Sequence, residues 1–271
     1  MPKKLLIIGF PKLRRSCAKV GSWIKNIRYK ALFLEFPRLL TEAVKSLSEG
    51  LPYNYVLSEV KKQGLIPEPT GSWEYYAEPI LKSLSQAKQN NPNMDIYCYR
   101  DSAYEKFSND MAVKITLLTL RSMITGKVDV KEWKKILIEE LKFSFKALEE
   151  EAEYITDIAK NYDVNVCLGG LAAKNIESFA CKEGFNVELR YIDTPYHYTP
   201  LEVLRNKLKE ELEGKVNPDH IFEKLIKQHI SYIKNYVLSS MNPDDAYDRW
   251  LKSEARKLEE IVKKDEIIFT G

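Results

Sequence analysis

Residues 164–175 of this 271-residue chain read VNVCLGGLAAKN, a short apolar run that meets a glycine pair and passes at once into a helix-forming segment. A buried parallel strand delivers the chain to the N-terminus of a helix in this way, and ligands often bind at such turns. The stretch therefore predicts an α/β fold in which Gly169 and Gly170 lie at the ligand-binding edge of a parallel sheet. Backbone N–H groups of this turn could then approach a ligand closely, with Lys174 nearby.

Four further apolar runs extend this prediction to a mostly parallel sheet. Buried parallel strands are short and continuously apolar, and helical patterns separate these runs from one another. The five predicted strands are residues 5–9, 31–36, 95–100, 164–169 and 187–192. Residues 266–270 close the chain and could form a sixth strand at an edge, so we expect a sheet of five to six strands.

Helical patterns fill most of the remaining chain. Residues 102–160 are helical almost throughout, with one break near 125–129, which predicts a long helical hairpin inserted between the third and fourth strands. Prolines begin three further helices in the last third of the chain. The first turn of a helix tolerates the missing N–H of proline, because that N–H would have no partner within the helix. We expect an α/β core over residues 1–199, including the insertion at 102–161, and C-terminal helices over 200–271 packed on that core with the final edge strand.

The composition excludes several classes of protein. The 42 basic and 39 acidic side chains nearly balance, which argues against a dedicated nucleic-acid-binding protein. No window approaches the roughly 18 consecutive apolar residues of a membrane helix. The opening MPKKLLIIGF has an apolar run too short for a signal peptide, so we interpret it as a strand and expect a cytoplasmic protein without a membrane partner.

The four cysteines lie far apart and form no Cys-x-x-Cys pair. Cysteines that bind metals normally come in close pairs, so these predict reduced core thiols and no metal site. With only three histidines, a multi-histidine metal site is not expected either, and no cofactor is predicted. Many Lys and Glu residues on the predicted helix faces would suit a thermophile.

The candidate site is the set of residues that directly follow the strands, because ligands of open parallel sheets bind outside the carboxyl ends of the strands. Polar or charged residues follow all five strands. Arginine binds oxyanions with two hydrogen bonds, tyrosine stacks and hydrogen-bonds, and a helix N-terminus favours negative charge. We therefore expect a small polar or anionic ligand. The expected ligand-binding residues are Lys12, Arg14, Arg15, Arg38, Tyr99, Arg100, Gly169, Gly170, Asp193 and Tyr196.

Three residues at the same strand ends are candidates for acid–base chemistry. Glu35 closes an otherwise apolar strand, and it could either pair with Arg100 or Arg38 or act on a ligand. Asp101 is followed by Ser102, so it could instead cap the next helix. His197 is the only histidine near a strand end, and it could be a general acid or base or a loop residue among tyrosines.

Three functions therefore remain open from the residues alone. The first is a ligand-binding protein, such as a sensor. The second is a hydrolase that uses Glu35, Asp101 or His197, with an arginine stabilising an oxyanion. The third is an interaction protein whose long helices form a homo-oligomer, which would leave an apolar stripe of the 102–160 hairpin exposed in a monomer. The sequence contains no GxGxxG, GxxxxGK[ST], GxSxG or HExxH motif, which removes support from four common enzyme classes.

The order of the strand-end motifs resembles one group of proteins, over residues 4 to 192. These motifs are IIGFPK, LFLEFP, CYRD and CLGGLAA. They resemble the motifs of the TraB/PrgY and Tiki-type proteins, which are similar to ChaN haem-uptake proteins and erythromycin esterases. In that group the first and last motifs are Gly-x-x-His, the second strand ends in a carboxylate, and an Asp/Arg pair precedes a helical insertion.

This chain departs from that pattern at both histidines. Lys12 stands where the first would be, and Ala172 or Ala173 where the second would be. The resemblance associates those histidines with metal-dependent hydrolysis, for which this chain offers no obvious ligands. Glu35, Arg100 and Asp101 match in position. The resemblance thus implies a divergent relative that kept a pocket and lost or replaced the chemistry.

Overall fold

The computed structural model describes residues 3–66 and 71–271, and contacts divide the chain into two units. The first, here called the sheet unit, comprises Met1–Lys106, Phe145–Asp193 and Gly271. The second, here called the helical unit, comprises Phe107–Ser144 and Thr194–Thr270. The helical insertion is thereby shared: its two ends belong to the sheet unit and its middle belongs with the C-terminal residues.

The sheet unit contains a five-stranded parallel sheet in the order β3-β2-β4-β1-β5. Its strands are β1 Lys4–Gly9, β2 Ala31–Pro37, β3 Asp95–Arg100, β4 Val164–Leu168 and β5 Asn186–Tyr191. The α/β fold and its parallel sheet are thus confirmed, and each predicted strand agrees with the observed one to within one residue at either end. β4, the strand of the VNVCL run, lies at the centre between β1 and β2.

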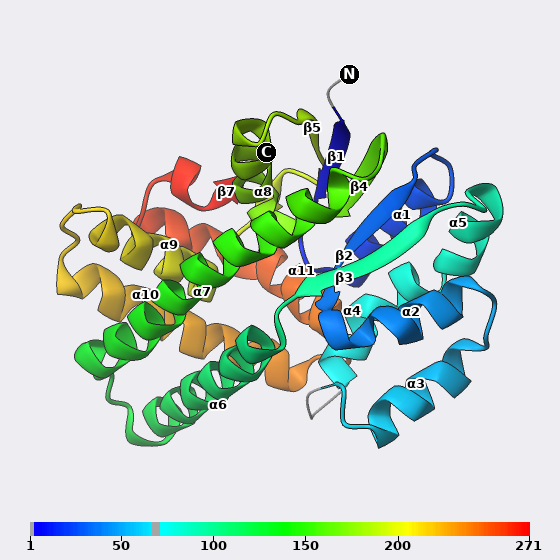
Figure 1. Cartoon of the computed structure of the whole chain (residues 1–271). Coiled ribbons are helices and arrows are strands. Elements are labelled where there is room, and N and C mark those ends of the chain that lie inside the picture. Colours follow the sequence, from blue (N-terminus) through cyan, green and yellow to red (C-terminus); the bar gives the residue numbers. More distant parts are fainter. Residues whose placement is uncertain (1–2, 67–70) are drawn as a thin grey trace. The chain divides into compact units, whose positions relative to one another are not determined.

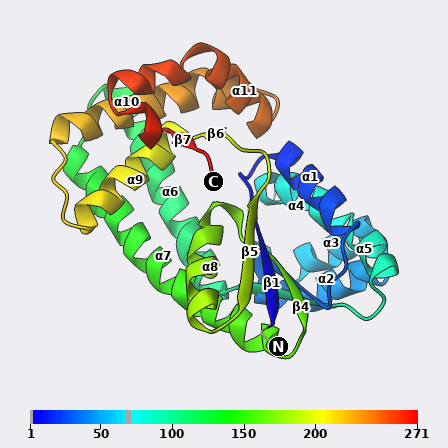
Figure 2. The same ribbon diagram turned by 90° about the horizontal axis from the view of Figure 1, so that it is seen from above.

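Helices cover both faces of this sheet (Figure 2), because successive strand residues point to opposite sides. Leu32 and Leu34 of β2 belong to one buried cluster, and Phe33 of the same strand belongs to the other. The first cluster is closed by α1 Arg14–Ile24, α2 Thr41–Ser48, α3 Tyr53–Lys62, α4 Gly71–Leu81 and α5 Leu84–Asn90. The second is closed by α8 Ala173–Lys182 and the end of α7 Val130–Ala159.

The predicted helical hairpin is confirmed between β3 and β4. It consists of α6 Ser102–Thr125 and α7, with a break at residues 126–129. The two helices run side by side in Figure 1, and their rings meet where Phe107 stacks on Phe143 at 4.1 Å. The break coincides with Gly126, which has a φ of +69° that favours glycine.

The helical unit packs the middle of this hairpin with three C-terminal helices. They are α9 Pro200–Leu212, α10 Asp219–Asn235 and α11 Pro243–Ser253. A 3₁₀ turn at Val237–Ser239 joins α10 to α11, and two further 3₁₀ turns, at Ala255–Glu260 and Lys264–Glu266, follow α11. Trp133 of α7 is buried against His229 of α10, with ring centroids 5.7 Å apart. Arg205 of α9 donates two hydrogen bonds of 2.8 and 2.7 Å to Glu140 of α7.

The strand at the end of the chain does not join the parallel sheet. β7 Ile268–Phe269 pairs antiparallel with β6 Tyr196–His197 in a separate two-stranded sheet. The possible sixth strand at the edge of the parallel sheet is therefore not found there, and that sheet has five strands. Tyr198 N–H extends this pairing to Ile267 O at 2.8 Å, and the Tyr198 and Phe269 rings are in contact. The short strand thus finds its partner within the helical unit.

Over the residues that the structure describes, no helix is both long enough and apolar enough to span a membrane.

Candidate functional site

The site begins with an irregularity in β2. Leu34 pairs with Cys98 and Pro37 pairs with Arg100, so two residues of β2 stand opposite a single residue of β3. Such a bulge bends the strand and redirects its side chains, and bulges are common beside functional sites. Glu35 is one of the two bulged residues. The bulge therefore interrupts the alternation of side chains between the two faces of the sheet at Glu35. In a regular strand this largely buried position would require an apolar residue.

Arg100, the last residue of β3, is the partner of Glu35. Its Nη1 donates a 2.6 Å hydrogen bond to Glu35 Oε1, and its guanidinium lies 4.5 Å from the centre of the Tyr104 ring. Its Nε lies 3.1 Å from Glu105 Oε1 and 3.6 Å from Glu151 Oε1, yet it makes no hydrogen bond. One buried guanidinium thus serves three carboxylates, and these carboxylates raise the pKa of Arg100 against the effect of burial.

Glu151 of α7 is the most buried member of this group, with only 3% of its surface exposed. Across residues 3–66 and 71–271, its Oε1 has no hydrogen-bond partner. Burial raises the pKa of the Glu151 carboxyl to about 7, and the attraction of Arg100 opposes this only in part. Near neutral pH this side chain therefore holds a proton in a substantial fraction of molecules.

The pKa of the Glu35 carboxyl is shifted in the opposite direction. Burial alone would raise its pKa, but Lys12 and Arg100 outweigh burial and hold the pKa of Glu35 below its usual range. The Lys12 Nζ lies 3.1 Å from Glu35 Oε1, on a side chain that is 62% exposed. Within the cluster, Glu35 is thus ionised, whereas Glu151 titrates near pH 7, and both lie beside the same arginine.

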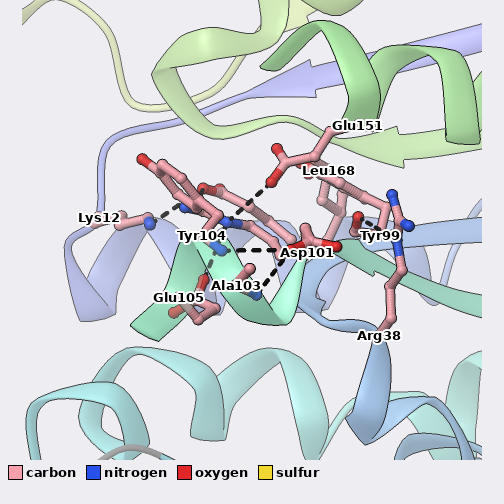
Figure 3. Close-up of polar contacts among 11 residues, drawn as sticks. Lys12, Arg38, Tyr99, Asp101, Ala103, Tyr104, Glu105, Glu151 and Leu168 are labelled. Carbon is pink, nitrogen blue, oxygen red and sulfur yellow. Dashed lines mark hydrogen bonds and ion pairs between the residues drawn. The ribbon is translucent and has the colours of Figure 1, made fainter. Parts of the chain in front are cut away.

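Gly170 brings the end of β4 to the same place. Its φ is +54°, and a Cβ added to it would lie 2.7 Å from Glu35 Oε2. The Gly170 carbonyl accepts a hydrogen bond of 3.2 Å from Phe10 N–H, in the loop after β1. Residues from the ends of β1, β2, β3 and β4 therefore meet around Glu35. Figure 3 shows Lys12, Tyr104, Glu105 and Glu151 gathered at this cluster.

Asp101 follows Arg100, but its side chain accepts hydrogen bonds from backbone N–H groups. Its Oδ1 accepts hydrogen bonds from the N–H groups of Ala103 at 2.7 Å and Tyr104 at 3.4 Å, as Figure 3 shows. This is the geometry of a helix N-cap, one of the two roles expected for Asp101. The cap fixes the direction in which α6 leaves β3, and so places Tyr104 and Glu105 beside Arg100.

Arg38 and Tyr99 lie next to the cluster and link the neighbouring strands and helices. Arg38 donates a 3.0 Å hydrogen bond from Nε to Tyr99 O, and its guanidinium lies 4.0 Å from the centre of the Tyr154 ring. Tyr99 is buried and donates its hydroxyl to Leu168 O at 2.8 Å, which links β3 to β4. Burial raises the pKa of Tyr99 well above its usual value.

A second polar group lies at the start of α1. Asp193, just after β5, has a φ of +66° and is bonded to Ser16 and Lys19, with Arg15 Nε at 3.7 Å. Burial would raise the pKa of Asp193, but Lys19 and Ser16 lower it on balance. Arg14 pairs with Glu78 and donates to Tyr75 O at 2.7 Å. Each of these arginines therefore already faces an oxygen acceptor of the chain.

The remaining predicted residues have other surroundings. Gly169 donates its N–H to Ile8 O at 2.9 Å, and a Cβ there would lie 3.0 Å from Ala173, so it serves close packing of strand and helix. Tyr196 and His197 belong to the helical unit.

Within the helical unit, both residues are enclosed by aromatic side chains. Tyr196 is buried against Tyr247, and its hydroxyl is 3.0 Å from Glu202 Oε2. The His197 Nδ1 lies 2.9 Å from Tyr198 O, and burial lowers the pKa of His197.

Sequence reasoning missed Glu105 and Glu151. Both lie on helices, and Glu151 stands in the run EEEAE at 149–153, which has the composition of a solvated helix face. Helical spacing does distinguish it from Glu149 and Glu150, because Glu151 lies four residues from both Ala147 and Ile155, on the apolar face of α7. Only the packing of α7 against the sheet buries this one carboxyl of the run.

Among the described residues, no group of three or more His, Cys, Asp or Glu side chains is arranged to hold a metal ion. Comparison with models of known families, with curated proteins and with solved structures finds no match for this chain.

Proposed function

We propose that this protein binds a small polar ligand with an anionic group at the carboxyl edge of its parallel sheet. The observation that carries the proposal is the convergence on Glu35: a strand bulge, a left-handed glycine at the end of β4 and charged side chains from the ends of β1, β2 and β3 meet at one point. Polar groups with strongly displaced pKa values gather in functional sites more often than elsewhere. The edge where they gather is the one that ligands use in this architecture.

The cations at this edge divide into two roles. Arg100 is nearly buried among three carboxylates, so it would organise the site. Lys12 is largely exposed and pairs with Glu35 among the residues that the structure describes, so it could turn to an incoming anion. The first turn of α1 contains Arg14 and Arg15 and no acidic residue, and the Glu78 and Asp193 carboxylates pair with these two arginines, so this turn favours negative charge.

Two further expectations belong to this proposal. The chain would be a divergent relative of the TraB-type proteins, in which Lys12 stands in place of the first histidine. It would work in the cytoplasm, where its four free cysteines, three of them buried, would stay reduced.

Thermal unfolding with added ligand tests the binding proposal. The probes are inorganic phosphate, pyrophosphate, citrate and adenosine monophosphate, and native mass spectrometry of freshly purified protein looks for a retained anion. We expect at least one probe to raise Tm in a concentration-dependent manner, because a ligand that binds only the folded state stabilises it. Lys12→Gln should abolish most of this shift.

Lys30→Gln is the matched control, since Lys30 is exposed and precedes β2 at the opposite edge of the sheet. A shift that both variants retain would contradict the proposed site. So would the absence of any retained ligand together with four inactive probes.

A second candidate function is acid–base catalysis, in which Glu151 donates the proton and Glu35 is the base. The observation that favours it is the opposite displacement of their two pKa values within one cluster, the pattern of paired catalytic carboxyls. Asp101 is occupied as a cap, so Glu151 replaces it in this scheme.

Hydrolysis of p-nitrophenyl esters and phosphates between pH 5 and 9 tests this second function. We expect the rate to fall as the pH rises through an apparent pKa near 7, because Glu151 then loses the proton that it donates. We also expect the activity to be lost in Glu151→Gln. A pH profile that is unchanged in this variant would rule out Glu151 as the acid.

A further inference from the structure

The middle of α6 carries an apolar stripe on its outer face. Four large side chains point away from the protein: Val113 is 59% exposed, Leu117 60%, Leu120 43% and Ile124 84%. The opposite face of the same helix is also apolar, since Met111, Ile115 and Leu118 are buried. A helix that is apolar on two faces normally has both covered. All four residues of the stripe belong to the helical unit.

The spacing of this stripe specifies the kind of partner. Its residues are separated by four, three and four positions, which is the narrow seam of a coiled coil rather than the broad face of a core helix. The sequence 4-3-4 also reads the same from either end. Two copies of α6 that run antiparallel about a twofold axis would therefore place Val113 opposite Ile124 and Leu117 opposite Leu120. Each apolar residue of the stripe would then face an apolar residue of the other copy.

The charges beside the stripe fit the same arrangement. On one flank Lys114 Nζ lies 3.9 Å from Glu139 Oε2, and Arg121 Nη1 lies 3.3 Å from Glu132 Oε1, with both acids on α7. In an antiparallel pair the Lys114–Glu139 pair of one copy would lie beside the Arg121–Glu132 pair of the other. The other flank carries Thr116 and Met123, which are uncharged. Neither flank therefore opposes self-association by unbalanced charge.

We propose that the stripe Val113, Leu117, Leu120 and Ile124 is a self-association surface, on which α6 of a second copy docks antiparallel. Symmetric twofold pairing is the commonest way in which chains associate with themselves. The seam spans three helical turns, about 17 Å, which is short for a coiled coil. We therefore expect a reversible dimer with a Kd of about 1–100 μM.

Sedimentation velocity over about 5–200 μM protein tests the dimer. The wild-type chain should move from 31.5 kDa toward twice that mass as its concentration rises, and Leu117→Glu should stay at 31.5 kDa throughout. Val216→Glu is the control, because Val216 is 93% exposed in the same unit but lies outside the stripe. A monomeric wild-type protein at about 200 μM, or a dimer that survives Leu117→Glu, would overturn the proposal.

Disulfide trapping in a Cys181→Ser background tests the direction of pairing, since Cys181 is the one exposed native cysteine. A mixture of Val113→Cys and Ile124→Cys chains should cross-link, and neither chain should cross-link with itself. In the antiparallel pair the two copies of position 113 would be about 17 Å apart, beyond the reach of a disulfide. Rapid cross-linking of Val113→Cys chains alone would show parallel pairing and refute the proposed geometry. A monomer that sediments with phosphatidylserine vesicles through Leu117 would refute the proposed partner.

Discussion

At the residue scale, Gly170 shows how one missing side chain allows the cluster to form. Its left-handed backbone favours glycine, and its Cα faces the Glu35 carboxylate so closely that a methyl group has no room. The glycine was predicted to permit a close approach to a ligand. In the structure the group that approaches it is Glu35, at the place where the ligand was expected.

We expect Gly170→Ala to lower the free energy of unfolding by about 2–4 kcal/mol, because it adds a steric conflict to the cost of a left-handed alanine. Urea unfolding measures this change. Gly184→Ala is the matched control: its φ is +82° and nothing lies within 4 Å of an added Cβ. That variant should lose only about 1 kcal/mol. Equal losses in the two variants would mean that Glu35 does not constrain Gly170.

Glu151 supplies the second residue-scale prediction, a dependence of stability on pH. Its folded-state pKa of about 7 lies above that of a glutamate in the unfolded chain, about 4.3. The folded state therefore binds the proton more tightly, and stability falls as the pH rises between these two values. The full penalty, up to about 4 kcal/mol, is present above about pH 7 and absent below about pH 4.

Glu151→Gln removes this penalty while keeping the size of the side chain. Relative to wild type, its free energy of unfolding should rise by about 2 kcal/mol between pH 5 and pH 8. Chemical denaturation at the two pH values measures the difference. Glu150→Gln, on the exposed neighbour, should show no such dependence. A Glu151→Gln variant that differs from wild type by the same amount at both pH values would contradict the displaced pKa.

At the element scale, the helix ends explain why several boundaries could be predicted. α9 begins at Pro200 after Thr199, and Thr199 and Glu202 form a capping box with a 2.7 Å hydrogen bond from Thr199 N–H to Glu202 Oε2. α11 begins with Pro243 after Asn242, whose side chain accepts from Asp245 N–H. These signals are local, and so they are readable from the sequence alone.

Thr199→Ala should destabilise the protein by about 1 kcal/mol, because it removes the Thr199 hydroxyl, which donates a 2.7 Å hydrogen bond to Glu202 Oε2 in this capping box. Thr116→Ala on α6 is the control, because Thr116 lies in mid-helix, where its hydroxyl bonds only to Ala112 O. That change should be neutral or slightly stabilising, since alanine is the better helix former. Thermal unfolding of both variants decides whether the capping box contributes.

At the scale of the whole molecule, the helical unit is built from two separate stretches of chain. Residues 107–144 and 194–270 are far apart in sequence, and Trp133 is only 1% exposed where α7 meets α10. The two stretches therefore depend on each other for a core. This dependence predicts that damage in α7 will unfold C-terminal helices before it unfolds the sheet.

Trp133→Ala should cost about 3–5 kcal/mol and increase hydrogen exchange at the amides of α9 and α10. The amides of β1 and β4 should exchange as they do in the wild type. Phe33→Ala, at a buried position of β2, should produce the reverse pattern. Uniform loss of protection in both variants would show that the two units unfold as one.

The sequence by itself determined the five strands, the helical hairpin and the edge of the sheet where charged residues gather. Runs such as residues 164–168 and 31–34 carry this information locally, because a buried parallel strand must be continuously apolar. For the same reason Glu35 could be singled out, because it is a carboxylate near the end of the otherwise apolar run 31–36.

Only the tertiary structure decided the rest. The bulge at Glu35, the burial of Glu151 and the pairing of residues 268–269 with residues 196–197 all depend on contacts between distant parts of the chain. Helical spacing places Glu151 on the apolar face of α7, but its displaced pKa depends on how deeply that face is buried and on the nearby Arg100, and only tertiary contacts set these. A helical pattern likewise shows that α6 is apolar on two faces, but only packing decides which face is buried and which is left for a partner.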